Sequence, residues 1–275
     1  MGGDAMTISV CSTDPRFRYA ARVLSGRGYP VLFADPGGSA PPPCDVLLLP
    51  LPITRDGVTV AGMPALTLSS CIGGTSPPRL LLGGNLSGEF VAGARRVGIA
   101  VRDYMDSGDF VLQNAALSAQ AALGILLSSS PAAPGENPTA ILGFGRIGKF
   151  LCRSLLSLGC PVTVFARAQI DRTLARLIGA NAKDTADLAS LTPYRTVVNT
   201  VPARLLSEGA VASLNPGSLL LELASGESNL PTPAPGSGVT LTVAHGLPGK
   251  VFPESAGRAL GETAARLIAD ALPKG

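Results

Sequence analysis

The stretch Thr139-Ala-Ile-Leu-Gly-Phe-Gly-Arg-Ile-Gly-Lys149 decides the fold. A short apolar run leads into the pattern Gly-x-Gly-x-x-Gly, and apolar residues then recur at helical spacing. This order predicts a strand, a tight turn and a helix whose positive end and backbone N–H groups face a pyrophosphate. Gly143 would make the turn, Gly145 would let the phosphates approach, and Gly148 would let helix and strand pack together.

The surroundings of this pattern favour a nucleotide site over a glycine-rich turn without a ligand. Gly159 is placed to end the helix, and residues 160–165 supply a second apolar strand. An NAD site usually has an Asp or Glu about twenty residues beyond the glycines, to bind the ribose 2′-hydroxyl. The chain has Ala166-Arg167-Ala168 instead. Because Arg167 can pair with a 2′-phosphate, we predict NADP as the cofactor. The alternative is that Arg167 is an ordinary surface residue.

Composition limits the classes of protein that the chain can form. Its 275 residues are enough for two domains, and a net charge of +3 with scattered basic residues gives no support for nucleic-acid binding. The apolar stretch from Val46 to Ile53 is too short to cross a bilayer. The first six residues lack the layout of a signal peptide. We therefore expect a cytoplasmic protein without a membrane partner.

The cysteines and the single histidine argue against a metal site and against disulfides. Five cysteines are an odd number, and none of them forms a C-x-x-C pair. We expect reduced, buried thiols. Because Cys and His ligands are not clustered, no metal site is predicted. The cysteines are Cys11, Cys44, Cys71, Cys152 and Cys160.

The order of the predicted elements indicates an α/β fold of two Rossmann-like parallel-sheet domains joined by a linker helix. The first domain, 1–128, has short strands near 7–11, 30–34, 45–49, 79–82 and 98–101, a helix at 18–25, and the linker helix at 110–128. A proline-rich stretch ends it. The second domain, 138–252, has helices at 171–178 and 184–191 and strands at 196–200, 218–223 and 239–244.

The last predicted helix, at 254–272, has an apolar face and follows the completed second sheet. The segment 253–275 is therefore free to pack back on the first domain. A substrate would bind in a cleft between the two domains, with the cofactor on one wall.

The stretch Ala244-His-Gly-Leu-Pro-Gly-Lys-Val-Phe-Pro-Glu-Ser-Ala-Gly257 resembles the C-terminal signature of the A-type subunit of dipicolinate synthase. In that family Gly-Leu-Pro-Gly is followed by a Pro and by Thr/Ser-Ala-Gly. Further positions resemble the family along most of the chain: Asp14, Arg16, Pro50, Gly57, Asn114, Ala166-Arg167, Asn199-Thr200, Pro202 and Leu223-Ala-Ser225.

The chain also departs from the family pattern. Ser12-Thr13 stands where the family has Gly-Gly, Gln120 where its linker helix has a Glu, and His245 where a Pro is common. The chain is thus identified as a divergent member.

The resemblance implies an enzyme of sporulation that works with a flavoprotein-like B-type subunit and forms homo-oligomers. Such an enzyme oxidises a cyclic dicarboxylate of the lysine pathway to pyridine-2,6-dicarboxylate, and bound NADP accepts the hydride. Arg16, Arg55 and Lys250 are candidates to hold the substrate carboxylates, with solvated surface charges as the alternative. Asp14 and His245 are candidate bases, although Asp14 could instead orient Arg16 and His245 could be a loop-surface residue.

The expected site divides into catalytic and cofactor-binding residues. Asp14, Arg16 and His245 are the catalytic candidates, and the Gly246–Gly249 loop is expected to close the cleft opposite the nicotinamide. Two other functions stay open: a different NADP-dependent dehydrogenase of small 2-hydroxy or amino acids, and a non-catalytic nucleotide-binding subunit. The cofactor-binding candidates are Gly143, Phe144, Gly145, Arg146, Ile147, Gly148, Ala166, Arg167, Thr200, Val201, Pro202, Ala224, Ser225, Leu247 and Pro248.

Overall fold

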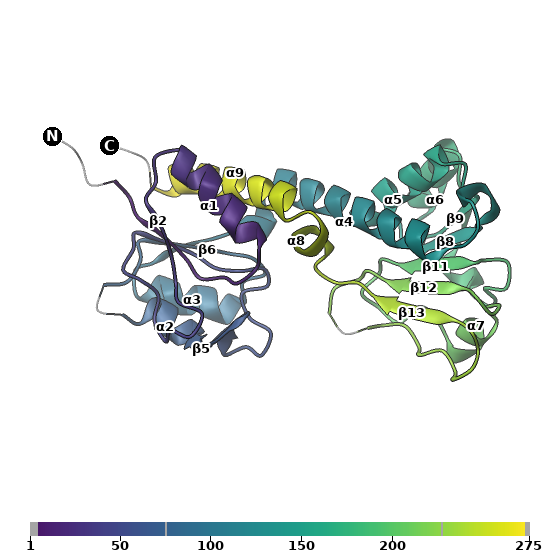
Figure 1. The fold of residues 1–275 in the computed structure, drawn as a ribbon, viewed down its shortest axis with the longest axis horizontal. Coiled ribbons are helices and arrows are strands. Elements are labelled where there is room, and N and C mark those ends of the chain that lie inside the picture. Colours follow the sequence, from purple (N-terminus) through teal and green to yellow (C-terminus); the bar gives the residue numbers. More distant parts are fainter. Residues whose placement is uncertain (1–4, 75, 227, 273–275) are drawn as a thin grey trace. The chain divides into compact units, whose positions relative to one another are not determined.

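The protein forms two compact α/β units, each built on a parallel sheet (Figure 1). The structure, a computed structural model, describes residues 5–74, 76–226 and 228–272. The first unit contains the chain up to Asn114 and again from Pro248, and the second contains Ala115 to Leu247. The fold class expected from the sequence is therefore confirmed. The division between the units falls inside the long linker helix, ahead of the proline-rich stretch.

The first unit has a five-stranded parallel sheet in the order β2-β1-β3-β6-β7. Its central strands are buried on both faces, as a covered parallel sheet requires. The predicted strands are present with slightly shifted ends. The strands are β1 (Ile8–Val10), β2 (Val31–Phe33), β3 (Val46–Leu48), β6 (Leu80–Gly83) and β7 (Ala100–Asp103), and the first helix is α1 (Arg16–Gly26).

Four of the elements described between β3 and β7 have no counterpart in the sequence prediction. They are an antiparallel hairpin of β4 (Thr59–Val60) and β5 (Met63–Thr67), the short helix α2 (Leu68–Ile72), and α3 (Gly88–Arg96). Ser87 caps α3 by accepting a hydrogen bond from the backbone N–H of Phe90, and Thr67 caps α2 in the same way from Ser70. Such caps are the local signals that could have revealed these helices.

The C-terminal helix α9 (Pro253–Ala271) packs on α1 within the first unit, as predicted. The backbones come very close, because an added Cβ at Gly257 would lie 2.2 Å from the carbonyl oxygen of Arg16. At Gly261 it would lie 2.8 Å from the carbonyl oxygen of Ala20. The side chain of Leu260 joins the core that Phe17 anchors. Glycine at these two positions is therefore what permits the close contact.

The second unit has a six-stranded parallel sheet in the order β10-β9-β8-β11-β12-β13. The strand order reverses between β8 and β11, and open α/β sheets bind ligands at such a switch point, beyond the carboxyl ends of the strands. The strands are β8 (Thr139–Leu142), β9 (Val162–Phe165), β10 (Asn181–Lys183), β11 (Thr196–Asn199), β12 (Leu219–Glu222) and β13 (Thr240–Val243), and the helices are α5 (Arg146–Ser157), α6 (Gln169–Leu177) and α7 (Glu208–Ala212).

One predicted helix of the second unit is wrong. Residues 184–191 form a single 3-10 turn, Thr185–Asp187, after β10. Asp184 accepts from the N–H of Ala186, and Asp187 accepts from the N–H of Asp184, so this capping box closes the turn locally. The acidic side chains at the start of the predicted helix thus cap one turn only.

The linker helix α4 (Gly108–Ser129) runs from the first unit into the second. Among the helices of the described ranges it alone is long and apolar enough to cross a membrane, by length and composition only. About 44% of its most apolar window is buried within the protein, and a core helix meets the same criterion. The helix is therefore weak evidence for a membrane span.

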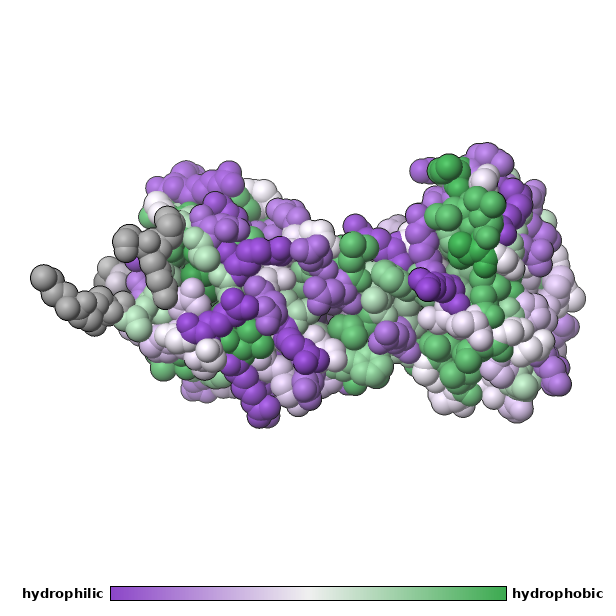
Figure 2. Space-filling model, turned by 90° about the horizontal axis from the view of Figure 1, so that it is seen from above, coloured by the Kyte–Doolittle hydropathy of each residue, from purple (hydrophilic) through white to green (hydrophobic). Residues whose placement is uncertain are grey.

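The outer surface of the second unit carries exposed hydrophobic side chains. Figure 2 shows hydrophobic residues gathered on one face of this unit. On α6, Ile170 is 75% and Leu177 is 79% exposed, and Phe150 of the neighbouring α5 is 37% exposed. Apolar side chains grouped in this way are typical of surfaces that meet another protein.

Candidate functional site

The three glycines of the turn after β8 have different steric settings. Gly143 has a positive φ of +93°, and an added Cβ would lie 2.4 Å from Cγ2 of Val201. At Gly148 an added Cβ would lie 2.5 Å from the carbonyl oxygen of Gly143. At Gly145 it would meet no atom within 4 Å. The turn is therefore closed toward the sheet and open at Gly145, the side on which a phosphate would approach.

The N-terminus of α5 begins at this opening. Gly145 is the N-cap residue, and no side chain caps the helix. The first-turn residues Arg146, Ile147 and Gly148 thus offer backbone N–H groups at the positive end of the helix. The side chain of Phe144 is buried, so only its backbone can face a ligand here. This arrangement is suited to bind an anion, and no charged side chain of the protein is needed to make it.

The loop after β11 is fastened to the end of β8. Both the backbone N–H and the hydroxyl of Thr200 donate to the carbonyl oxygen of Leu142, at 3.0 and 2.8 Å. The side chain of Val201 fills the space beside Gly143. Thr200 and Val201 therefore lie beside the glycine turn, and Pro202 follows them in the same loop.

The turn after β9 presents a free arginine. Ala166 is buried and Arg167 is exposed, and no hydrogen bond or ion pair joins the Arg167 side chain to another residue in the described ranges. Arg172 supports the turn by donating to the carbonyl oxygens of Ala166 and Arg167, at 2.7 and 2.6 Å. Asp184, on the adjoining loop, forms its ion pair with Arg172. The arginine predicted to bind a 2′-phosphate is thus unpaired, while the nearby carboxylate is occupied.

The first unit brings together Asp14, Arg16 and the start of the returning chain. Arg16 is the first residue of α1, and its side chain is only 5% exposed. Its guanidinium donates from Nε and Nη2 to Oδ2 of Asp14. An added Cβ at Gly249, in α8 (Leu247–Val251), would lie 2.9 Å from Nε of Arg16 and 3.0 Å from Oδ1 of Asp14. Asp14 therefore orients Arg16, which was one of the two roles considered for it.

Tyr104 adds a buried phenol to this unit. Its hydroxyl donates to the carbonyl oxygen of Leu49 at 3.2 Å, and its ring lies against Gly84. Burial raises the pKa of Tyr104 well above its usual range, an effect that the nearby Arg16 charge partly opposes. Tyr104 was not among the predicted site residues. The sequence feature that could have indicated it is a tyrosine directly after the fifth strand of a parallel sheet.

The remaining predicted residues differ in their burial. Arg55 and Lys250 are exposed. His245 belongs to the second unit, and its Nε2 is buried without a hydrogen-bond partner in the part of the chain described. Leu247 and Pro248 are buried at the point where the chain returns to the first unit. Ala224 is buried and Ser225 is exposed, both directly after β12.

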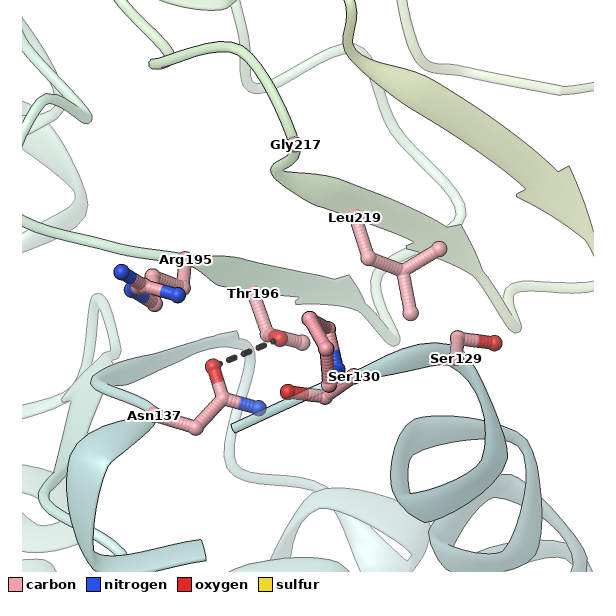
Figure 3. A pocket seen from close by; sticks show the side chains of 8 residues that line it. Ser129, Ser130, Asn137, Arg195, Thr196, Gly217 and Leu219 are labelled. Atoms are coloured by element: carbon pink, nitrogen blue, oxygen red, sulfur yellow. Dashed lines mark hydrogen bonds between the residues drawn. The ribbon is translucent and has the colours of Figure 1, made fainter. Parts of the chain in front are cut away.

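A small pocket lies at the opposite edge of the second sheet (Figure 3). It has a volume of about 10 Å³, which is room for about one water molecule. Thr196 donates to the amide oxygen of Asn137 at 3.2 Å in its wall. Because it lies at the amino ends of β8, β11 and β12, this pocket is separate from the predicted cofactor edge. It is lined by Ser129, Ser130, Pro131, Asn137, Arg195, Thr196, Gly217 and Leu219.

Neither metal ligands nor disulfides contribute to these sites within the described ranges. No group of three or more His, Cys, Asp or Glu side chains there could hold a metal ion. The five thiols are free; four are buried and Cys44 is half-buried. Burial raises the pKa of Cys11 to about 12 and that of Cys44 to about 11, which makes both thiols unreactive near neutral pH.

The parallel sheets and the glycine turn define a fold of the Rossmann type, like that of known dehydrogenases. D-lactate dehydrogenase from Escherichia coli has the same fold, with a TM-score of 0.66 at 13% identity over 96% of each chain. The dipicolinate synthase A chain from Bacillus subtilis is more similar, with a TM-score of 0.78 at 20% identity over 98% of this chain and 97% of that one.

The sequence comparison also finds a similarity to the dipicolinate synthase A chain. The A-type subunit of dipicolinate synthase from Bacillus subtilis (strain 168) is 31% identical over 133 residues, which are 48% of this chain and 45% of the relative. The matched segment thus spans less than half of the relative's length. No family model matches the chain. The resemblance noted in the sequence motifs is confirmed, because the chain is similar to the dipicolinate synthase A chain in both sequence and fold.

Proposed function

We propose that the chain is an oxidoreductase that binds a nicotinamide dinucleotide at the turn from Gly143 to Gly148. The observation that carries this proposal is the opening at Gly145, which lies at the uncapped N-terminus of α5 and at the switch point of the parallel sheet. The pyrophosphate would be held by backbone N–H groups of Arg146, Ile147 and Gly148. When bound, the nicotinamide supplies a hydride acceptor.

The proposed dinucleotide is NADP. The exposed Arg167 follows β9, where the ribose of the bound cofactor would lie, and it has no partner within the described ranges. The two carboxylates that follow β9 most closely in the sequence are both paired already, Asp171 with Lys149 and Asp184 with Arg172. A guanidinium that is free to move suits a 2′-phosphate better than a 2′-hydroxyl.

The proposed substrate is a cyclic dicarboxylate of the lysine pathway, and the product is pyridine-2,6-dicarboxylate. This proposal is supported by the relationship to the dipicolinate synthase A chain. One ring C–H bond breaks and its electron pair leaves as hydride to NADP, while one proton passes to a base. Arg16 would hold a substrate carboxylate, with Arg55 and Lys250 as further candidates.

His245 is the better candidate for the base. The carboxylate of Asp14 is engaged by Arg16, whereas Nε2 of His245 has no partner in the described part of the chain. The unprotonated nitrogen of a neutral imidazole has a lone pair that can accept a proton. Asp14 then acts by orienting Arg16.

The partner, oligomeric state, location and biological role of the proposed enzyme are inferred from its similarity to the dipicolinate synthase A chain. We infer a flavoprotein-like B-type subunit as partner, a homo-oligomeric state, a cytoplasmic location and a role in sporulation. The exposed apolar side chains of α5 and α6 support contact with another protein.

The proposal is tested by incubating the purified chain with NADP and the lysine-pathway cyclic intermediate, with and without the B-type subunit. The absorbance of pyridine dicarboxylate should rise together with that of NADPH. Binding of NADPH without turnover, whether or not the B-type subunit is present, would assign the chain to a non-catalytic nucleotide-binding role. Turnover of small 2-hydroxy or amino acids in place of the ring substrate would assign it to a different dehydrogenase reaction.

A further inference from the structure

Glu222, the last residue of β12, has a completely buried carboxylate. Among the residues that the structure describes, no Lys, Arg or His forms an ion pair with it. Removing a carboxylate from water without a counter-charge is costly unless hydrogen bonds replace the lost hydration. A charged residue at this position therefore needs a specific reason.

The carboxylate is surrounded by N–H donors. The side-chain amide of Asn199 donates to both of its oxygens, at 3.0 and 3.1 Å. The backbone N–H of Ala224 donates to Oε1 at 2.9 Å, and that of Asn229 donates to Oε2 at 3.1 Å. An ionised carboxylate only accepts hydrogen bonds, and it can satisfy all of these donors at once. An apolar side chain here would leave buried N–H groups without a partner.

Asn199 connects the carboxylate of Glu222 with the loop after β11. It is the register partner of Glu222 on the adjacent strand β11. Its side chain also accepts from the N–H of Val201 at 3.1 Å and donates to the carbonyl oxygen of Val201 at 3.0 Å. The Val201 side chain in turn fills the space beside Gly143. One cross-strand pair thus connects the loop after β12 with the loop after β11 and with the glycine turn.

We propose that Glu222 is a positioning residue for the dinucleotide site. It acts through Asn199 and the backbone of Ala224, and it holds the loops that carry Thr200 to Pro202 and Ala224 to Ser225 against the glycine turn. This inference rests on the proposed function, because the loops matter for binding only if the dinucleotide lies at this edge. It assigns a role to a residue that lines no described pocket and that the proposed chemistry does not use.

The test compares Glu222→Gln with a matched control, Glu208→Gln. Glutamine keeps the shape of the side chain but turns one acceptor oxygen into a donor that faces N–H groups. Glu208 lies in the same unit, and its side chain is 86% exposed. The affinity for NADPH is measured by fluorescence titration, and hydrogen exchange is followed at the amides of Ala224 and Asn229. Unfolding of each variant is followed by circular dichroism.

We expect Glu222→Gln to remain folded, to bind NADPH at least tenfold more weakly, and to exchange faster at both amides, while Glu208→Gln matches the wild type. The double variant Asn199→Asp/Glu222→Gln reverses donor and acceptor across the pair and should recover part of the affinity. This recovery distinguishes positioning from general destabilisation. It also keeps the test decisive if the single variant folds poorly.

A folded Glu222→Gln protein with wild-type affinity and exchange would overturn the inference, and so would a double variant that regains its stability without regaining any affinity. These results are separable from a failure of the proposed function. In that case the wild-type chain itself would bind neither NADPH nor NADH.

Discussion

Arg16 and Asp14 form a largely buried ion pair in which Nε and Nη2 of the guanidinium both donate to Oδ2 of the carboxylate, at 2.9 and 2.7 Å. The backbone N–H of Arg16 donates to the other oxygen, Oδ1, at 3.0 Å. The carboxylate thus fixes both the first turn of α1 and the direction of the guanidinium. A cation held in this way is pre-oriented, which favours recognition of a substrate carboxylate over a solvated surface role.

Arg16→Ala should lower kcat/KM for the ring substrate at least tenfold, or about 1.4 kcal/mol, while the affinity for NADPH stays unchanged. The reason is that Arg16 is proposed to hold the substrate and lies in the unit without the glycine turn. Steady-state kinetics and a separate NADPH titration measure the two effects. The control is Arg18→Ala, two residues on and exposed. Normal activity in a folded Arg16→Ala enzyme would remove Arg16 from the substrate site.

Arg167→Ala should weaken NADPH binding by roughly 1.5–3 kcal/mol, the range for losing one hydrogen bond to a charged group. The affinity for NADH should hardly change, because NADH lacks the 2′-phosphate. Arg153→Ala provides the control, since Arg153 is an exposed arginine on α5 of the same unit. Fluorescence titration with both cofactors decides the matter. Equal losses for NADPH and NADH would contradict the proposed phosphate contact.

Gly145→Val and Gly148→Val should fail in different ways. An added side chain at Gly145 meets no protein atom within 4 Å, so this variant should fold and yet lose dinucleotide binding. At Gly148 the Cβ would lie 2.5 Å from the carbonyl oxygen of Gly143, so this variant should lose stability as well. Circular dichroism and cofactor titration on both variants separate the effects. A folded Gly145→Val protein that keeps its affinity would place the site elsewhere.

Gly257→Ala should destabilise the first unit by about 1–3 kcal/mol through overpacking. The new methyl group would lie 2.2 Å from the carbonyl oxygen of Arg16, a backbone atom that cannot move without shifting α1. Gly124→Ala, on α4, meets no atom within 4 Å and should be neutral or stabilising, because alanine favours the helix. Urea unfolding of both proteins gives the comparison. Equal stabilities would show that α9 does not depend on close contact at Gly257.

The buried thiols should make the folded state less stable in alkali. Burial raises the pKa of Cys11 and of Cys152 to about 12 from 9.0, so the folded protein holds these protons after the unfolded chain has begun to release them. This contribution to stability is complete below pH 9 and is lost as the pH rises from 9 toward 12. Replacing Cys152 by Ala should flatten that part of the stability profile in urea melts. The same slope between pH 9 and 12 in the variant would show that the Cys152 thiol does not cause the loss of stability.

The same thiols should react slowly with alkylating reagents. At pH 8 the folded protein should be labelled far more slowly than the urea-unfolded chain, with Cys44 first because it is the half-buried thiol. Mass spectrometry after timed labelling identifies the modified residue. Rapid labelling of Cys11 or Cys152 in the native protein would show that the core around them opens readily.

Several features were predictable from the sequence because their physical causes are local. The glycine turn and the start of α5 depend on residues within one strand and one helical turn, and the structure has both where the sequence predicts them. The return of α9 to the first unit followed from its apolar face and from its position after the last strand. The presence of Arg167 and the lack of an acid directly after β9 could be read from the sequence. The assignment of NADP built on it stays a prediction.

Other features were decided only by the tertiary structure. The predicted helix at 184–191 was wrong because the capping box at Asp184 closes one turn, while the residues before it pair with β9. The contact of Glu222 with Asn199 depends on the register of β12 against β11, which brings together residues 23 positions apart. The burial of Arg16 against Gly249 likewise requires the chain to return from the second unit. Propensities act within a few residues, whereas strand register and burial are set by packing of the whole unit. The sequence by itself therefore determined most of the strands, the long helices and the glycine turn, while the packing decided which polar groups meet.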